Sequence, residues 1–144
     1  MKSIFKMKLK YLFLALLISV VVLHAANNKM LFGIWEISEF KLVQRGVETV
    51  SNEKELRDAG AVWDMHFNAD GTFKQNFNMR GNEMKMETES GKWHTVNDSL
   101  FIELQIDTFV SKVKYSYIIL GDVVVFTIQN PKSNDKIVTR FRRK

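Results

Sequence analysis

The chain contains no cysteine among its 144 residues, and Pro131 is the single proline. The absence of cysteine excludes disulfide frameworks, thiolate metal sites and cysteine nucleophiles. It also excludes a lipid attached to a cysteine near the N-terminus. A domain exported without disulfides has to be held together by a buried core, and a chain of this length can supply one such core. Pro131 lies in a polar stretch, 130–135, that we predict to be a loop.

The first 25 residues have the pattern of a secretory signal peptide. Four lysines and no acid occupy residues 1–10, and a thirteen-residue apolar run follows at 11–23. Small residues come next, and we place cleavage after Ala25. A membrane-spanning helix needs about 20 apolar residues, so a cleaved signal is the interpretation we adopt. An uncleaved N-terminal anchor is the alternative. We expect a periplasmic or secreted product with no stable membrane insertion after cleavage.

Removal of this segment changes the charge balance. The whole chain has 21 Lys and Arg against 16 Asp and Glu, a net charge of +5, but residues 26–144 keep 17 bases and 16 acids. The basic character therefore belongs mainly to the targeting signal, and it does not support nucleic-acid binding.

Residues 26–144 carry the two-residue periodicity of β-strands. Eight or nine such runs are visible: 33–43, 62–68, 72–79, 84–88, 92–96, 99–108, 113–120, 123–129 and 136–142. Turn residues separate them, and they include Asp70-Gly71, Ser90-Gly91, Asn97-Asp98 and Gly121-Asp122. One short helix is predicted near 52–60, where Asn52 and Glu55 form a capping-box pattern. We predict one all-β domain, an antiparallel up-and-down meander closed into a barrel, with a β-sandwich as the alternative.

Three stretches resemble the lipocalin superfamily, in particular the small lipocalin-like domains of exported Bacteroidetes-type proteins. They are Gly33-Ile34-Trp35, the hairpin from Met65 to Phe73 with Asp70-Gly71 at its turn, and Gly91-Lys92-Trp93 leading to Asn97-Asp98-Ser99-Leu100. The resemblance covers about residues 33–142 and implies a lipocalin-like barrel. It also implies that Trp35 packs at the closed end of the barrel under a basic side chain of the last strand, Arg140 or Arg142, in a cation–π contact. Gly33, Trp35, Arg140, Asp70 and Gly71 are therefore predicted structural residues.

Catalytic and metal-binding patterns are weak in this sequence. Asp64 and His66 share a strand face, but they alternate with better core residues, so we interpret that face as solvated. A metal site from His66, His94, Asp64 and Glu103 lacks recognisable ligand spacing. Glu87 and Glu89 also share a face, which we interpret as exposed. We predict a protein without enzymatic activity, metal or cofactor.

The aromatic residues of the strands allow two interpretations. They could fill a small barrel completely, or they could line a cavity with a few polar groups. Such polar groups would be Gln75, Thr127 and the hydroxyls of Tyr115 and Tyr117. We predict that the ligand-binding residues are Met65, Phe67, Phe73, Gln75, Phe77, Trp93, Tyr115 and Tyr117. The predicted function is the binding of a small lipophilic molecule; the alternative is a protein-interaction or inhibitor module with a filled core. The sequence does not define an oligomeric state.

Overall fold

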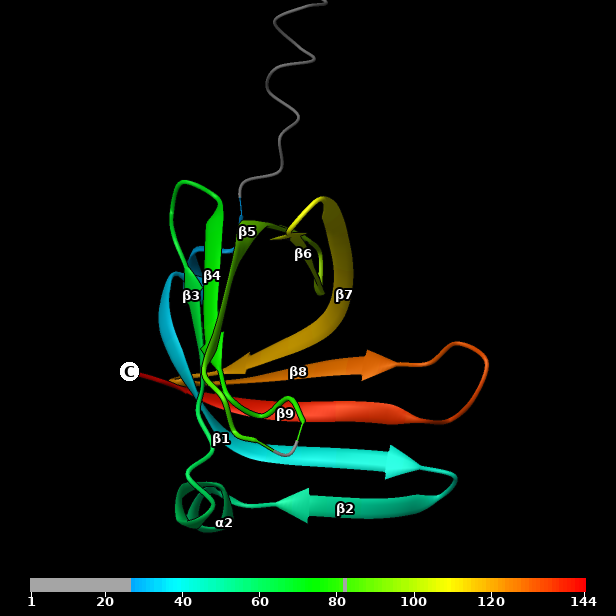
Figure 1. Ribbon diagram of the computed structural model, residues 1–144. Helices are drawn as coiled ribbons and strands as arrows, with labels where there is room; N and C mark the ends of the chain where they lie inside the picture. Colours follow the sequence, from blue (N-terminus) through cyan, green and yellow to red (C-terminus); the bar gives the residue numbers. More distant parts are fainter. Residues whose placement is uncertain (1–26, 82) are drawn as a thin grey trace, which may run out of the picture.

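The computed structural model describes residues 27–81 and 83–144, so the predicted signal peptide lies outside the described residues. Within them lie nine strands, one α-helix and one 3-10 turn (Figure 1). The strands are β1 (Gly33–Gln44), β2 (Val47–Ser51), β3 (Trp63–Phe67), β4 (Thr72–Phe77), β5 (Glu87–Val96), β6 (Ser99–Ile106), β7 (Phe109–Leu120), β8 (Val123–Gln129) and β9 (Lys136–Arg143). The helix is α2 (Glu53–Asp58), and the 3-10 turn is η1 (Lys29–Leu31).

All pairings between these strands are antiparallel, and the sheet closes on itself. β3 to β9 pair in sequence order, and β1 joins the two edges by pairing with both β3 and β9. This gives an eight-stranded barrel made of β1 and β3 to β9, as the sequence predicts. A closed barrel leaves no unpaired edge within those strands. The alternation of the strands then places one set of side chains inside and the other outside.

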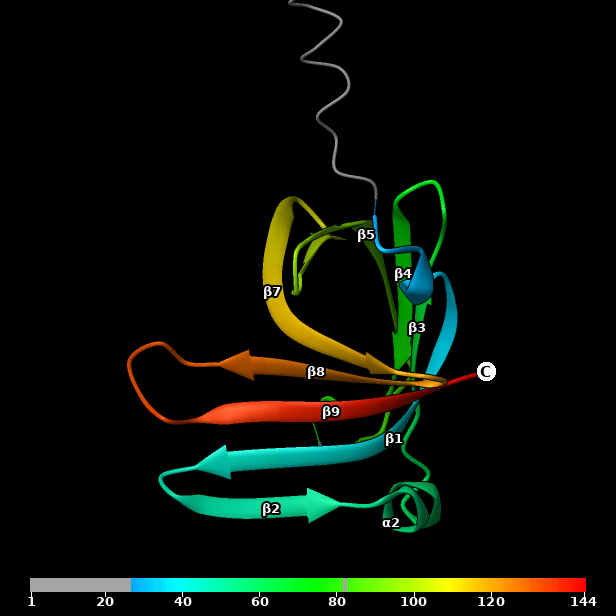
Figure 2. The same cartoon turned by 180° about the vertical axis from the view of Figure 1, so that it is seen from behind.

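β2 and α2 lie outside this closed ring. β2 pairs only with the second half of β1, as a hairpin, and the chain then enters α2 before it reaches β3 (Figure 2). Asn52 caps the helix as the sequence predicts: its side chain accepts from the backbone N–H of Glu55, and the Glu55 carboxylate accepts from the Asn52 N–H. β2 was not predicted from the sequence. Ser90-Gly91 was predicted to be a turn, whereas β5 runs through that point without a break.

A β-bulge at Ser38 changes which side chains of β1 face inward. The pairing of β1 with β9 shifts between Ile37 and Glu39, and the Ser38 hydroxyl donates to the carbonyl of Arg140 at 3.2 Å. Before the bulge Trp35 and Ile37 are buried in the core, and after it Phe40 is packed against that core. The bulge therefore moves the inward positions from odd to even numbers.

Residues 27–32 close one end of the barrel. The side chain of Asn28 donates to the Tyr117 hydroxyl at 3.0 Å, and its backbone N–H donates to the Thr95 hydroxyl at 2.9 Å. Leu31 is fully buried, and its carbonyl accepts from the Trp35 indole N–H at 2.8 Å. This segment before β1 is therefore a plug, held by side chains of three different strands.

The basic residue over Trp35 is Arg143, not Arg140 or Arg142. The Arg143 guanidinium lies 4.2 Å from the centre of the Trp35 ring and donates to the carbonyls of Phe32 and Met30 at 2.6 and 2.7 Å. The strand register explains the correction, because Arg143 is the partner of Trp35 on β9 and shares its face. Arg140 is exposed on the opposite, outer face.

We expect Arg143→Met to destabilise the barrel by about 2 kcal/mol, since it removes the cation–π contact and two charge-assisted hydrogen bonds to the plug. Arg140→Met is the matched control, and it should change stability by less than about 0.5 kcal/mol. Urea unfolding of both variants, followed by circular dichroism, measures the difference. Equal losses for the two variants would contradict the role of Arg143 at the closed end.

Candidate functional site

The half of the barrel beside the plug is filled by aromatic side chains. The Phe67 ring lies 5.1 Å from both Phe73 and Trp93, centroid to centroid, and 6.1 Å from Phe126. Phe126 lies in turn 5.7 Å from Phe141. All five side chains are at most 3% exposed. Two of these four ring pairs are edge-to-face and two are tilted, and aromatic rings at such distances pack efficiently, so this half has the character of a core.

The other half of the barrel contains a cavity of about 480 Å³. Small-molecule sites in proteins typically measure about 300–1,000 Å³. The lining comes from β1, β3 to β8 and the loop after β4: Phe40, Trp63, Gln75, Phe77, Met79, Arg80, Glu89, Leu104, Ile106, Ser111, Val113, Tyr115 and Ile128. Most of these side chains are apolar, and the polar ones are few, which is the composition of a site for a largely apolar molecule.

Four polar side chains of the cavity form one connected chain of hydrogen bonds. The Trp63 indole N–H donates to Gln75 Oε1 at 3.0 Å, and Gln75 Nε2 donates to Glu89 Oε2 at 2.7 Å. The other carboxylate oxygen of Glu89 accepts from Arg80 Nη2 at 3.2 Å. Gln75 and Glu89 are Cα partners on β4 and β5, so the sheet register itself brings them together. Glu89 is therefore a buried carboxylate, 9% exposed, held in a fixed orientation.

Tyr115 adds a hydroxyl to this wall of the cavity. Burial and, to a smaller extent, the nearby negative charge of Glu89 together raise the pKa of Tyr115 to about 12. The phenol therefore stays protonated at neutral pH. It can donate one hydrogen bond and accept others, so the cavity presents it as a neutral polar group.

Arg80 belongs to the loop after β4 and lies at the mouth of the cavity. Its side chain is 60% exposed, and it also donates to Glu87 at 3.1 Å. Its guanidinium lies 4.9 Å from the centre of the Phe77 ring. The Arg80 side chain thus extends from the buried carboxylate of Glu89 to the solvent.

The structure divides the predicted ligand-binding residues between the two halves. Gln75, Phe77 and Tyr115 line the cavity. The remainder are buried in or beside the filled half: Met65, Phe67, Phe73, Trp93 and Tyr117. Thr127 does not face the interior; it is the Cα partner of Ser116, which is exposed on the outer face.

Glu89 is the functional candidate that the sequence interpretation missed. We interpreted its face as exposed and solvated; the structure buries Glu89 instead. The available signal was the alternation of Glu89 with Trp93 and Thr95, all at odd positions and all buried in β5. The assumed turn at Ser90-Gly91 interrupted that alternation and concealed it.

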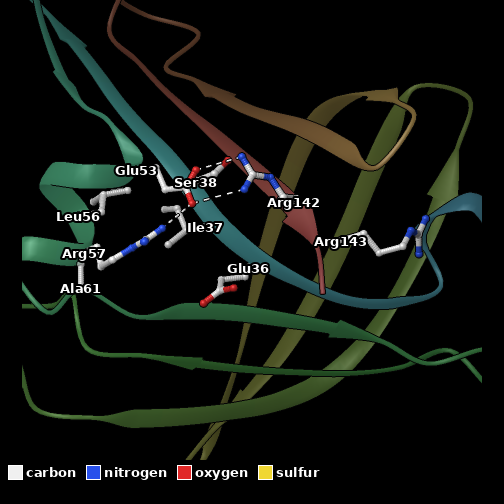
Figure 3. A pocket seen from close by; sticks show the side chains of 9 residues that line it. All are labelled: Glu36, Ile37, Ser38, Glu53, Leu56, Arg57, Ala61, Arg142 and Arg143. Atoms are coloured by element: carbon white, nitrogen blue, oxygen red, sulfur yellow. Dashed lines mark hydrogen bonds and ion pairs between the residues drawn. The ribbon is translucent and has the colours of Figure 1, made fainter.

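A second, smaller hollow of about 120 Å³ lies between α2, β1 and β9 (Figure 3). Glu53 occupies its centre and accepts from Arg57 at 2.7 Å and from Arg142 at 3.0 Å. The charges of Glu53, Arg57 and Arg142 are paired with one another, so we interpret this hollow as the junction that attaches α2 to the barrel. No residue of α2 lines the large cavity, so the helix is not a lid on it.

The residues that were weighed as a metal site lie apart from the cavity. The His94 ring stacks on Phe101 with a centroid distance of 4.9 Å, and Glu103 pairs with Lys112. Asp64 lies 3.4 Å from the Lys144 ammonium. Among residues 27–81 and 83–144, no three His, Asp or Glu side chains gather as a metal site would require. The same residues include no helix long and apolar enough to cross a membrane.

The pairings and the cavity together define the chain as an up-and-down antiparallel β-barrel with an internal, mainly apolar cavity. Comparison with protein-family models gives no match, and comparison with curated proteins gives none either. Among solved structures, the chain is similar to a point mutant of the fluorescent protein UnaG, with 12% identity and a TM-score of 0.44 over 80% of this chain and 96% of that one. A likeness this distant adds nothing about function to what the barrel itself shows.

Proposed function

We propose that this protein binds a small apolar or amphipathic molecule in the barrel and performs no chemistry on it. The cavity is the single observation that carries the proposal. Its size suits a small organic ligand, and its walls are mainly apolar with a few polar side chains. Burial of apolar surface contributes roughly 25 cal/mol per Å², so an apolar molecule gains by leaving water for this space.

The polar groups support binding rather than catalysis. A general acid or base has to lie within reach of the proton that it transfers. Glu89 is held by Gln75 and Arg80, and among the described residues no second acid and no histidine lines the cavity to take the other half of a proton transfer. We propose further that the protein is exported, on the basis of the basic and apolar N-terminal pattern, and that it belongs with the small bacterial lipocalin-like proteins, on the basis of the three sequence stretches.

A neutral apolar dye tests the proposed function. We expect N-phenyl-1-naphthylamine to bind the purified protein saturably, with dye fluorescence rising and Trp63 emission quenched, because Trp63 lines the cavity. Val113→Phe, which fills the cavity, should weaken binding by about tenfold or more. Val125→Phe, on the outer face of β8, is the control and should bind as the parent does. Absence of saturable binding in the parent protein would contradict the proposal.

An outer surface favours a second candidate, a protein-interaction module. On β7, Ile118 and Leu120 are 64% and 62% exposed, and they pair with Val125 and Val123 of β8. Contiguous exposed apolar side chains mark many interaction sites. If the dye does not bind, this surface becomes the better candidate, and a partner contact there should be lost in Leu120→Lys.

A further inference from the structure

The cavity contains a buried negative charge with unused hydrogen-bonding capacity. Each Glu89 oxygen accepts one hydrogen bond, from Gln75 or from Arg80. A carboxylate has about four acceptor positions, so Glu89 can accept further hydrogen bonds. The carboxylate side chain is 9% exposed, whereas that of its charged partner Arg80 is 60% exposed. A ligand inside the barrel therefore meets the Glu89 charge with little screening by water, while solvent screens Arg80.

Tyr115 indicates how this environment acts on a second charge. Its hydroxyl resists ionisation because of burial and because Glu89 is nearby. A ligand carboxylate at the same wall would be disfavoured both by burial and by the negative charge of Glu89. A ligand ammonium would be disfavoured by burial but attracted by that negative charge.

Arg80 does not reverse this preference. To bind a ligand carboxylate, Arg80 would have to be shared with or withdrawn from Glu89 and Glu87, both of which it already contacts. Withdrawal would leave Glu89 buried without a cationic partner, and an uncompensated buried charge is strongly unfavourable. An ammonium group can approach Glu89 while the Arg80 contact stays in place.

We infer that the ligand has an apolar body and a hydrogen-bond-donating, cationic amine head, and that Glu89 receives this head inside the barrel. This inference rests on the proposed function, since it names the ligand class of the same cavity. Gln75 orients the carboxylate, and the apolar lining receives the body of the ligand.

Three probes with the same octyl chain test the inference: octylammonium, octanol and octanoate. Each is titrated against the protein loaded with N-phenyl-1-naphthylamine, and dye displacement gives its affinity. We expect octylammonium to bind about tenfold or more tighter than octanoate, with octanol between them. Glu89→Gln should reduce that ratio to about unity. Glu103→Gln, which removes an acid from the outer face of β6, should leave the ratio unchanged.

A second variant keeps the test decisive if Glu89→Gln does not fold. Arg80→Gln changes an exposed side chain but leaves Glu89 without its cationic partner, so octylammonium should take the place of that partner and bind at least as tightly as it binds the parent. Octanoate binding best to the parent, or octylammonium losing its affinity in Arg80→Gln, would overturn the inference and leave the proposed function standing. Absence of dye binding would overturn the proposed function itself, and the inference with it.

Discussion

Gly91→Ala should prevent the barrel from closing in its present form, with a loss of more than about 3 kcal/mol in the free energy of unfolding. A Cβ at this position would lie 1.8 Å from the Glu103 carbonyl oxygen and 2.8 Å from its carbonyl carbon. Both atoms belong to the backbone of β6, so no side-chain rotation relieves the overlap. β5 and β6 would have to separate at Gly91.

The control for this prediction is Ser90→Ala. Ser90 is the neighbour of Gly91 on β5, but its side chain is exposed, and its truncation should change stability by less than about 0.5 kcal/mol. Urea denaturation and near-ultraviolet circular dichroism of both variants measure the effect. A folded Gly91→Ala variant with the stability of the parent would show that β5 and β6 do not approach this closely.

The close approach at Gly91 also has a consequence for the site. β5 carries Glu89 at the cavity and Trp93 in the filled half, with Gly91 between them and all three on the inner face. Because Gly91 has no side chain, β5 can lie close to the β6 backbone at this position. β5 therefore contributes residues both to the cavity and to the filled half of the barrel. Gly91→Ala should therefore also abolish binding of N-phenyl-1-naphthylamine.

The sequence was sufficient to predict the fold class because period-two alternation and turn residues are local signals. β6 shows this best: Leu100, Ile102 and Leu104 are buried, and they alternate with more exposed residues. Gly121-Asp122 likewise forms the predicted turn between β7 and β8. These features depend on neighbouring residues, and a sequence pattern records them directly.

Features that depend on pairing between distant strands were not predictable. The bulge at Ser38 changes the inward positions of β1, and only the register with β9 reveals it. A shift of one residue exchanges the two faces of a strand. The register between β1 and β9 likewise decides that Arg143, and not Arg140, reaches Trp35. Gly91 illustrates a further ambiguity: glycine can mark a turn or a close approach of two strands, and the sequence alone does not distinguish them.

The division of the interior into a filled half and a cavity likewise depends on summed volumes rather than on pattern. Phe73 and Phe77 have the same inward alternation on β4, yet Phe73 packs against Phe67 at 5.1 Å and Phe77 borders empty space. Two interpretations of the aromatic residues, a filled core and a lined cavity, each describe one half of the barrel. The predicted ligand-binding residues are therefore spread over both halves, and Glu89, the buried acid of the cavity, was not among them.

Phe126→Ala should cost about 3–5 kcal/mol, because Phe126 is the central ring of the filled half. It lies within 6.5 Å, centroid to centroid, of four other aromatic rings, those of Phe67, Tyr115, Tyr117 and Phe141. Truncation removes these contacts at once, and the closed sheet around them restricts collapse into the void. The lost transfer energy and the cavity then add.

The control is Phe109→Ala, whose ring is 56% exposed at the start of β7 and whose removal should cost less than about 1 kcal/mol. Urea unfolding of both variants gives the comparison. Because Phe126 also contacts Tyr115, which lines the cavity, it forms part of the support beneath the site, and Phe126→Ala should weaken dye binding as well as stability. A loss of under about 1 kcal/mol for Phe126→Ala would mean that the half beside the plug is loosely packed. The cavity would then lack the rigid support on which a defined ligand site depends.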